Sequence, residues 1–224
     1  MEGAERGFFS DVAQNYDKLS RALTAGLDNF WRRRAVDLVG GLGKARVLDV
    51  ATGTGNIAIM IAKRYRGYGV TGIDLNSQML SIAKKKAKGI SNLRFVNGDI
   101  ESIRMKSGSF DIVISSFALS AFEDLPKAIA SMYRVLRPGG TLILLDVNKR
   151  RNKIFTSLLG AYQMLSVAPT FSGELRREVN MYIHSKRFKI DRQELTRILE
   201  EAGFKLVEAR DLSFRTVFII KCSK

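Results

Sequence analysis

The sequence predicts an α/β fold built on a seven-stranded, mostly parallel sheet. From residue 44 onward, short runs rich in Val and Ile alternate with stretches of helical periodicity, which is the pattern of successive βαβ units. Near the C-terminus, two apolar runs are separated only by Leu212 and Ser213, and this short link favours an antiparallel hairpin at the sheet edge. These observations predict a Rossmann-like sheet whose last strand is antiparallel.

The expected elements follow in order along the chain. Strands are predicted at 45–50, 69–74, 93–96, 110–115, 140–146, 205–211 and 214–221, where β-branched residues gather. Helices are predicted at 54–65, 77–88, 124–136 and 191–202, the last opening on Asp191 and Glu194 in a capping-box pattern. The sequence RPGG at 137–140 should end one helix before the fifth strand begins.

Two segments lie outside this alternation, and the whole chain, 1–224, is still expected to form a single domain. Residues 1–40 are interpreted as an N-terminal helical lid. Residues 147–190 form an insertion too long for a simple loop, which indicates a substrate cap. Within it, the uncharged stretch 154–171 follows the basic cluster Lys149 to Lys153. That stretch is too short and polar for a membrane span, so an interfacial surface, a cap over an apolar substrate and a helix covering the sheet remain open.

Composition limits the location and the partners. The single cysteine excludes a disulfide framework and a cysteine-rich metal site, and no metal is expected. The first 30 residues lack a continuous apolar run, so a cytoplasmic location is expected. The net charge of +15 favours an anionic partner, either nucleic acid or the surface of an anionic membrane, but an ion-pair-rich surface of a heat-adapted protein would also explain it. A homodimer is left open.

The strongest motif is VLDVATGTGN at 47–56. A buried strand ends at Asp49, and a turn of small residues then leads into a helix, so backbone amides can approach a ligand closely. Gly53 and Gly55 carry no Cβ, and Ala51 is the smallest substitute for a third glycine. A dinucleotide site or tight packing alone would also suit such a turn.

Acidic residues then end the next two strands. Asp74 can accept both hydroxyls of a ribose, and Asp99 can accept from the amino group of an adenine, although each could simply cap a helix. A pyrophosphate would be repelled by Asp49, whereas the ammonium and sulfonium of S-adenosylmethionine are favoured beside acids. GxGxxG and the P-loop lysine are both missing. The expected cofactor is therefore S-adenosyl-L-methionine.

Four segments carry a family resemblance: VLDVATGTGN, IDLNSQML, FDIVISSFALSAF and SMYRVLRPGGTLILLD. They resemble class I S-adenosylmethionine-dependent methyltransferases, and specifically the ubiquinone/menaquinone biosynthesis C-methyltransferase family. The stretch 16–31 adds Tyr16, Asp17, Leu23 and Trp31 at the spacing of that family's N-terminal signature. The resemblance covers most of the chain and weakens between 147 and 190.

The resemblance implies C-methylation of a small hydrophobic, quinol-like acceptor. It also implies donor contacts at Tyr16, Thr54, Asp74 with Leu75, Asp99 with Ile100, and Ser116. The chain departs from the family where it has Asp28 in place of histidine, and Ser120 with Ala121 in place of an Arg-Asn pair that is thought to position the quinol. Another small or lipid-like acceptor, an RNA substrate and a non-catalytic binding role remain as alternatives.

The catalytic base is not assigned. His184 in the predicted cap is a candidate because an imidazole can accept a proton near neutral pH, but a packing or surface role fits it as well. Methylation of pyrimidine carbon-5 requires a thiol nucleophile, and Cys222 is badly placed in a C-terminal tail. Arsenite methylation requires several thiols, and the Asn/Asp-Pro-Pro-aromatic run of amino-methylating enzymes is replaced by residues 115–118.

Overall fold

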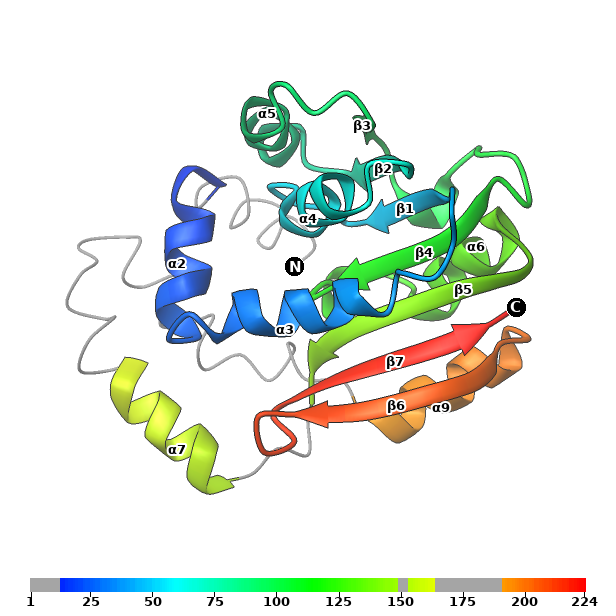
Figure 1. Cartoon of the computed structure of the whole chain (residues 1–224). Coiled ribbons are helices and arrows are strands. Elements are labelled where there is room, and N and C mark those ends of the chain that lie inside the picture. Colours follow the sequence, from blue (N-terminus) through cyan, green and yellow to red (C-terminus); the bar gives the residue numbers. More distant parts are fainter. Residues whose placement is uncertain (1–12, 149–152, 164–190) are drawn as a thin grey trace.

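The computed structural model describes residues 13–148, 153–163 and 191–224. Its seven-stranded sheet has the order β3-β2-β1-β4-β5-β7-β6, as Figure 1 shows. Strands β1 to β5 pair in parallel, whereas β7 is antiparallel to both β5 and β6, so the predicted sheet is confirmed. The strands are β1 (Arg46–Val50), β2 (Gly69–Asp74), β3 (Leu93–Asn97), β4 (Phe110–Ser116), β5 (Leu136–Val147), β6 (Lys205–Leu212) and β7 (Val217–Ser223).

Helices cover both faces of the sheet. One face carries α3 (Leu27–Asp37), α4 (Asn56–Arg64) and α5 (Ser77–Lys86), and the other carries α6 (Leu125–Val135) and α9 (Arg192–Glu201) (Figure 1). Two further helices, α2 (Tyr16–Leu23) and α7 (Lys153–Tyr162), lie beyond the carboxyl ends of the parallel strands (Figure 1). Short 3-10 helices are η1 (Ala13–Asn15), η2 (Ile100–Ser102) and η3 (Leu119–Ala121).

The core follows the two-residue period of the strands. In β5, Leu142 and Leu144 pack with α6 and α9, whereas Ile143 and Leu145 pack on the opposite face with α3 and α4. All four side chains are fully buried. Apolar residues at both alternating positions therefore specify a central strand that is covered on both sides.

The link of the final hairpin is longer than predicted. β7 begins at Val217 rather than at 214, so residues 213–216 join it to β6. Ser213, Phe214 and Arg215 have φ of 45°, 55° and 66°, and three successive left-handed residues form a tight turn that apolar patterning does not reveal. Beside this turn, Leu212 of β6 pairs with Val217 of β7.

The RPGG sequence also differs from the expectation. Helix α6 ends at Val135, but β5 already starts at Leu136 and includes these four residues. The register of β5 against β4 shifts between Phe110 and Ile112, which is a local bulge, and Gly139 adopts a φ of 69° there. Gly139 and Gly140 therefore belong to a bulge at the start of β5 rather than to a separate turn.

The predicted cap is described only in part. Helix α7 lies within it, and the side chain of Gln163 donates a hydrogen bond of 2.7 Å to the Leu23 carbonyl at the end of α2. Residues 164–190, with His184 and the remainder of the apolar stretch, lie outside the described residues. Among the described helices, none combines the length and the apolar character that a bilayer crossing requires.

Candidate functional site

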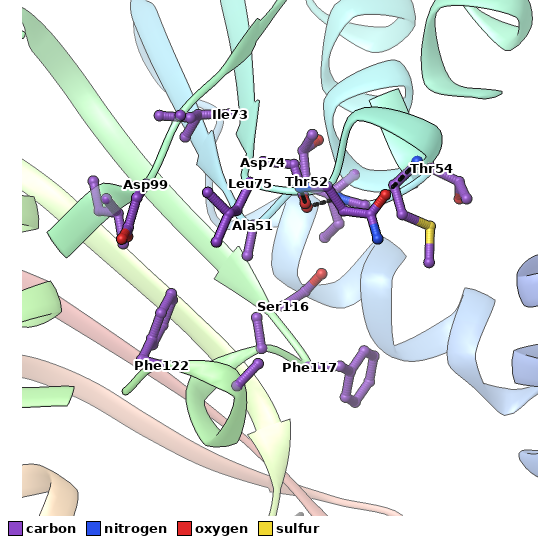
Figure 2. A pocket seen from close by; sticks show the side chains of 18 of the residues that line it. Ala51, Thr52, Thr54, Ile73, Asp74, Leu75, Asp99, Ser116, Phe117 and Phe122 are labelled. Carbon is purple, nitrogen blue, oxygen red and sulfur yellow. Dashed lines mark hydrogen bonds between the residues drawn. The ribbon is translucent and has the colours of Figure 1, made fainter. Parts of the chain in front are cut away.

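A cavity of about 730 Å³ opens at the carboxyl ends of the central strands (Figure 2). Open α/β sheets place their ligands at this edge. Most of the predicted site residues meet there although they come from α2 and from four different strand ends. Those that line the cavity are Tyr16, Ala51, Gly53, Thr54, Asp74, Leu75, Asp99, Ile100 and Ser116.

The other two predicted residues, Asp49 and Gly55, stand behind the cavity lining. The Asp49 carboxylate is 1% exposed and accepts hydrogen bonds from the Thr52 hydroxyl at 2.5 Å and the Ala58 amide at 3.1 Å. Gly55 has a φ of 80°, and a Cβ there would lie 2.9 Å from the Phe95 ring. Both residues therefore support the glycine turn from behind.

Asp74 connects the end of β2 to that turn. One carboxylate oxygen accepts from the Gly53 amide at 2.7 Å and the other from the Asn76 amide at 2.8 Å. Ala51 and Gly53 both have positive φ, 53° and 55°, which brings the turn close to the carboxylate. Burial raises the pKa of Asp74, and the two amide hydrogen bonds oppose that rise.

Asp99 caps a short helix and also lines the cavity. Its carboxylate lines the cavity and also accepts from the Glu101 amide at 2.9 Å, which caps η2. The next residue, Ile100, is buried in the core under the cavity, whereas Leu75 remains 48% exposed. The acidic side chains of β2 and β3 thus share one edge of the cavity with apolar neighbours (Figure 2).

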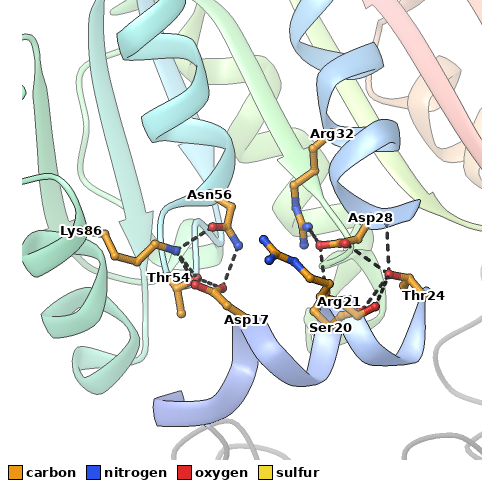
Figure 3. A network of polar contacts seen from close by, with 9 residues as sticks. All are labelled: Asp17, Ser20, Arg21, Thr24, Asp28, Arg32, Thr54, Asn56 and Lys86. Atoms are coloured by element: carbon orange, nitrogen blue, oxygen red, sulfur yellow. Dashed lines mark hydrogen bonds and ion pairs between the residues drawn. The ribbon is translucent and has the colours of Figure 1, made fainter. Parts of the chain in front are cut away.

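The sequence did not predict the hydrogen bonds that join Asp17 of α2 to the glycine turn and to α5, which we call the latch. Asp17 accepts hydrogen bonds from Thr54 at 2.6 Å, Asn56 at 2.9 Å and Lys86 at 2.6 Å (Figure 3). Burial alone would raise the pKa of Asp17, but these hydrogen bonds together outweigh it and hold the pKa below its ordinary value. The latch fixes α2 against the turn, so that Tyr16 reaches the cavity.

Another unpredicted feature is the support of residues 117–123, which follow β4 and form one wall of the cavity. Asp146, buried in β5, accepts hydrogen bonds from the Leu119 amide at 3.0 Å and the Val147 amide at 2.7 Å, and the Ala118 amide also bonds to it. Burial raises the pKa of Asp146 to about 6, against the effect of these amides. The carboxylate therefore shapes the wall that presents Ser120 to the cavity.

The cysteine and the acids do not form other reactive centres in the part of the chain that is described. Cys222 is fully buried in β7 rather than in a tail, and burial raises its pKa to about 12, so it is not a nucleophile. Across residues 13–148, 153–163 and 191–224, no cluster of His, Cys, Asp and Glu is suited to holding a metal ion.

Asp49→Asn should change the pH dependence of stability. Burial, opposed by the Thr52 and Ala58 hydrogen bonds, raises the pKa of Asp49 from 3.8 to about 7. The folded state therefore binds the proton more tightly, and this group's stabilising contribution is complete below pH 3.8 and is lost as pH rises towards 7. The uncharged variant should gain stability relative to the wild type by about 1 kcal/mol per pH unit over that range. Urea unfolding at several pH values measures the difference, and parallel curves would contradict the assignment.

Comparison with known proteins places the chain in one family. The model of the ubiE/COQ5 methyltransferase family matches residues 3–224. The demethylmenaquinone methyltransferase of Chlorobaculum parvum is 34% identical over 226 residues, covering 98% of this chain and 92% of that one. The one from Thermus thermophilus is 43% identical over 139 residues, covering 62% and 63%.

Solved structures agree on the fold. A SAM-dependent methyltransferase from Aquifex aeolicus superposes with a TM-score of 0.69 at 19% identity, covering 96% of this chain and 97% of that one. The family match extends over nearly the whole chain, and the cavity lies at the edge where the glycine turn and the acids meet. The chain therefore belongs to the ubiE/COQ5 methyltransferase family and is an S-adenosylmethionine-dependent methyltransferase.

Proposed function

We propose that this enzyme methylates a ring carbon of a quinol-like aromatic acceptor. The observation that carries the proposal is the composition of the cavity, which is acidic at the ends of β2 and β3 and aromatic beyond β4, where Phe117 and Phe122 line it (Figure 2). An acidic end suits a cationic donor, and an aromatic end suits a flat apolar ring. The relatives named demethylmenaquinone methyltransferases support the same class of acceptor.

In this proposal the donor occupies the acidic half of the cavity. Asp74 accepts the ribose hydroxyls, since each of its oxygens has a second lone pair besides the one that meets a backbone amide. Asp99 accepts from the adenine amino group. The remaining donor contacts would come from the cavity-lining residues predicted from the sequence: Tyr16, Ala51, Gly53, Thr54, Leu75, Ile100 and Ser116.

The reaction is a displacement at the sulfonium methyl group. The ring carbon forms a bond to the methyl carbon while the carbon–sulfur bond breaks, which leaves a neutral thioether. The methylated ring then loses its proton to water or to a base, so that one proton is released per methyl group transferred. The donor is already activated, and the protein contributes orientation, which can supply roughly 7 to 11 kcal/mol.

Turnover of a reduced demethylmenaquinone analogue by the purified protein tests the proposal. With S-adenosylmethionine present, we expect the quinol to gain one methyl group on the ring, detected by mass spectrometry. The oxidised quinone is the matched control and should not react, because its ring carbons are electron-poor. Methylation of RNA or of another small molecule, with no quinol turnover, would reject the quinol and leave the donor site intact.

We also propose that α7 contacts the surface of an anionic membrane, where a lipid-tailed quinol would be found. Leu158 and Tyr162 on this helix are 67% and 37% exposed. In the sequence, four basic residues within 149–153 directly precede or begin the helix. Basic charge beside exposed apolar side chains is typical of interfacial helices.

Flotation with phospholipid vesicles measures this contact. The protein should float with vesicles that contain anionic lipid and less with neutral ones, and Leu158→Glu should reduce flotation because it puts a charge on the contacting face. Leu42→Glu, the same substitution at an exposed leucine outside α7, is the control. Absence of flotation with both kinds of vesicle would limit α7 to a role in the cap.

A further inference from the structure

Arg32 brings a positive charge to the cavity. Among the described residues that line it, the other ionisable side chains are the acids Asp74, Asp99, Glu101 and Glu123, together with Tyr16. Arg32 is nevertheless 5% exposed, so most of its surface is buried within the protein. A buried cation that reaches a largely acidic cavity is a candidate ligand for an anionic oxygen.

Asp28 holds Arg32 from one turn earlier on the same helix. The two side chains form a buried ion pair, and Asp28 also accepts from Ser20 at 3.4 Å and Thr24 at 3.2 Å (Figure 3). Buried ion pairs generally add little stability over an apolar pair of similar volume. The network therefore holds the guanidinium in position without adding much stability, which points to a functional role for Arg32.

Phe117 fixes the other side of the guanidinium. The Arg32 Cζ atom lies 5.2 Å from the centre of the Phe117 ring, and that ring packs at 6.1 Å from Trp31. Phe117 has a φ of 55°, an unfavourable conformation for a bulky residue, at the point where β4 ends and the cavity begins. Strained residues of this kind gather at ligand sites, where the surrounding structure holds them.

We propose that Arg32 binds the ring oxygen of the acceptor as its anion and that Asp28 is the positioning residue for Arg32. The inference rests on the proposed function, since it concerns the acceptor of the same cavity. The oxygen anion donates an electron pair into the ring, the ring carbon takes the methyl group from sulfur, and a neutral dienone forms. Loss of the ring proton to water or a base then restores the aromatic ring and the oxygen anion.

The need for a cation follows from the charges that surround it. Asp28 from α3, Tyr16 from α2 and Asp49 from β1 all lie close enough to Arg32 to interact electrostatically. Without Arg32, the Asp28 carboxylate and the ionised form of Asp49 would disfavour an anion in the cavity. The Arg32 guanidinium carries five N–H donors and directs one of them to Asp28. Other donors can therefore bind an oxygen of the acceptor.

Kinetics of Arg32→Gln test this role. We expect kcat/KM for the quinol to fall by about 100-fold, as when a donor to a developing oxyanion is removed. The pH–rate profile should move to higher pH because the acceptor hydroxyl ionises less readily without the cation, and Arg32→Lys should restore part of both losses. Affinity for S-adenosylhomocysteine should stay unchanged. Arg33→Gln, the same change at the next and exposed residue, is the control.

A binding experiment keeps the inference separable from the proposed function. The absorbance of 4-nitro-1-naphthol reports whether the bound phenol is ionised, and its apparent pKa should be lower on the wild type than in water. Asp28→Asn with Arg32→Gln removes the ion pair without leaving a buried charge unpaired, and should raise that pKa at least to the value in water. An unchanged probe pKa in the double variant would overturn the role of Arg32, whether or not the quinol is a substrate. Probe ionisation without quinol turnover would reject only the quinol.

Discussion

Asp74→Ala is expected to weaken binding of the methyl donor by about 30- to 150-fold, which corresponds to 2 to 3 kcal/mol. The proposed ribose contacts would be lost, and the Gly53 and Asn76 amides would lose their acceptor at the same time. The second effect loosens the glycine turn, so the loss should be seen for S-adenosylmethionine and for S-adenosylhomocysteine alike. Titration calorimetry with both ligands measures it.

Two further variants make the result specific to this carboxylate. Asp74→Asn keeps one carbonyl oxygen and should therefore lie between the wild type and Asp74→Ala. Asp37→Ala removes a half-exposed carboxylate at the end of α3, outside the cavity, and should bind the donor as the wild type does. Unchanged donor affinity in a folded Asp74→Ala protein would reject the ribose assignment.

Asp146→Ala is expected to destabilise the fold by about 3 to 5 kcal/mol, because buried amides left without an acceptor each cost about 1 to 3 kcal/mol. The affected amides belong to Ala118, Leu119 and Val147. Urea unfolding at pH 8 gives the lower limit of the effect: burial raises the pKa of Asp146 from 3.8 to about 6, so this group's stabilising contribution is complete below pH 3.8 and is lost as pH rises through 6.

The variant should also affect activity, because the wall formed by residues 117–123 lines the cavity. The wall carries Ser120 and Phe122 at the aromatic end of the cavity, so Asp146→Ala should impair acceptor turnover more than donor binding. Asp146→Asn retains one acceptor oxygen and should be the milder variant. Equal stability of the alanine variant and the wild type would show that the amides find other partners.

The sequence by itself determined the sheet, the edge at which the cavity lies and most of the predicted residues that meet there. Two-residue apolar periodicity and small-residue turns are local signals, and parallel strands bring their carboxyl ends to one edge. Acids at or just after the ends of successive strands, such as Asp74 and Asp99, were therefore predictable as neighbours although they are 25 positions apart. The glycine turn was equally predictable, because its conformation depends on residues next to each other.

The tertiary structure alone decided which polar side chains meet across different elements. Asp17 bonds to Thr54 and Lys86, residues 37 and 69 positions away, and such pairings have no periodicity that a sequence could display. It also decided that Asp49 supports the turn from behind whereas Arg32, one of three successive arginines, reaches the cavity. The direction of a charged side chain depends on how its helix packs and on the cost of burying it, and both are set by distant contacts.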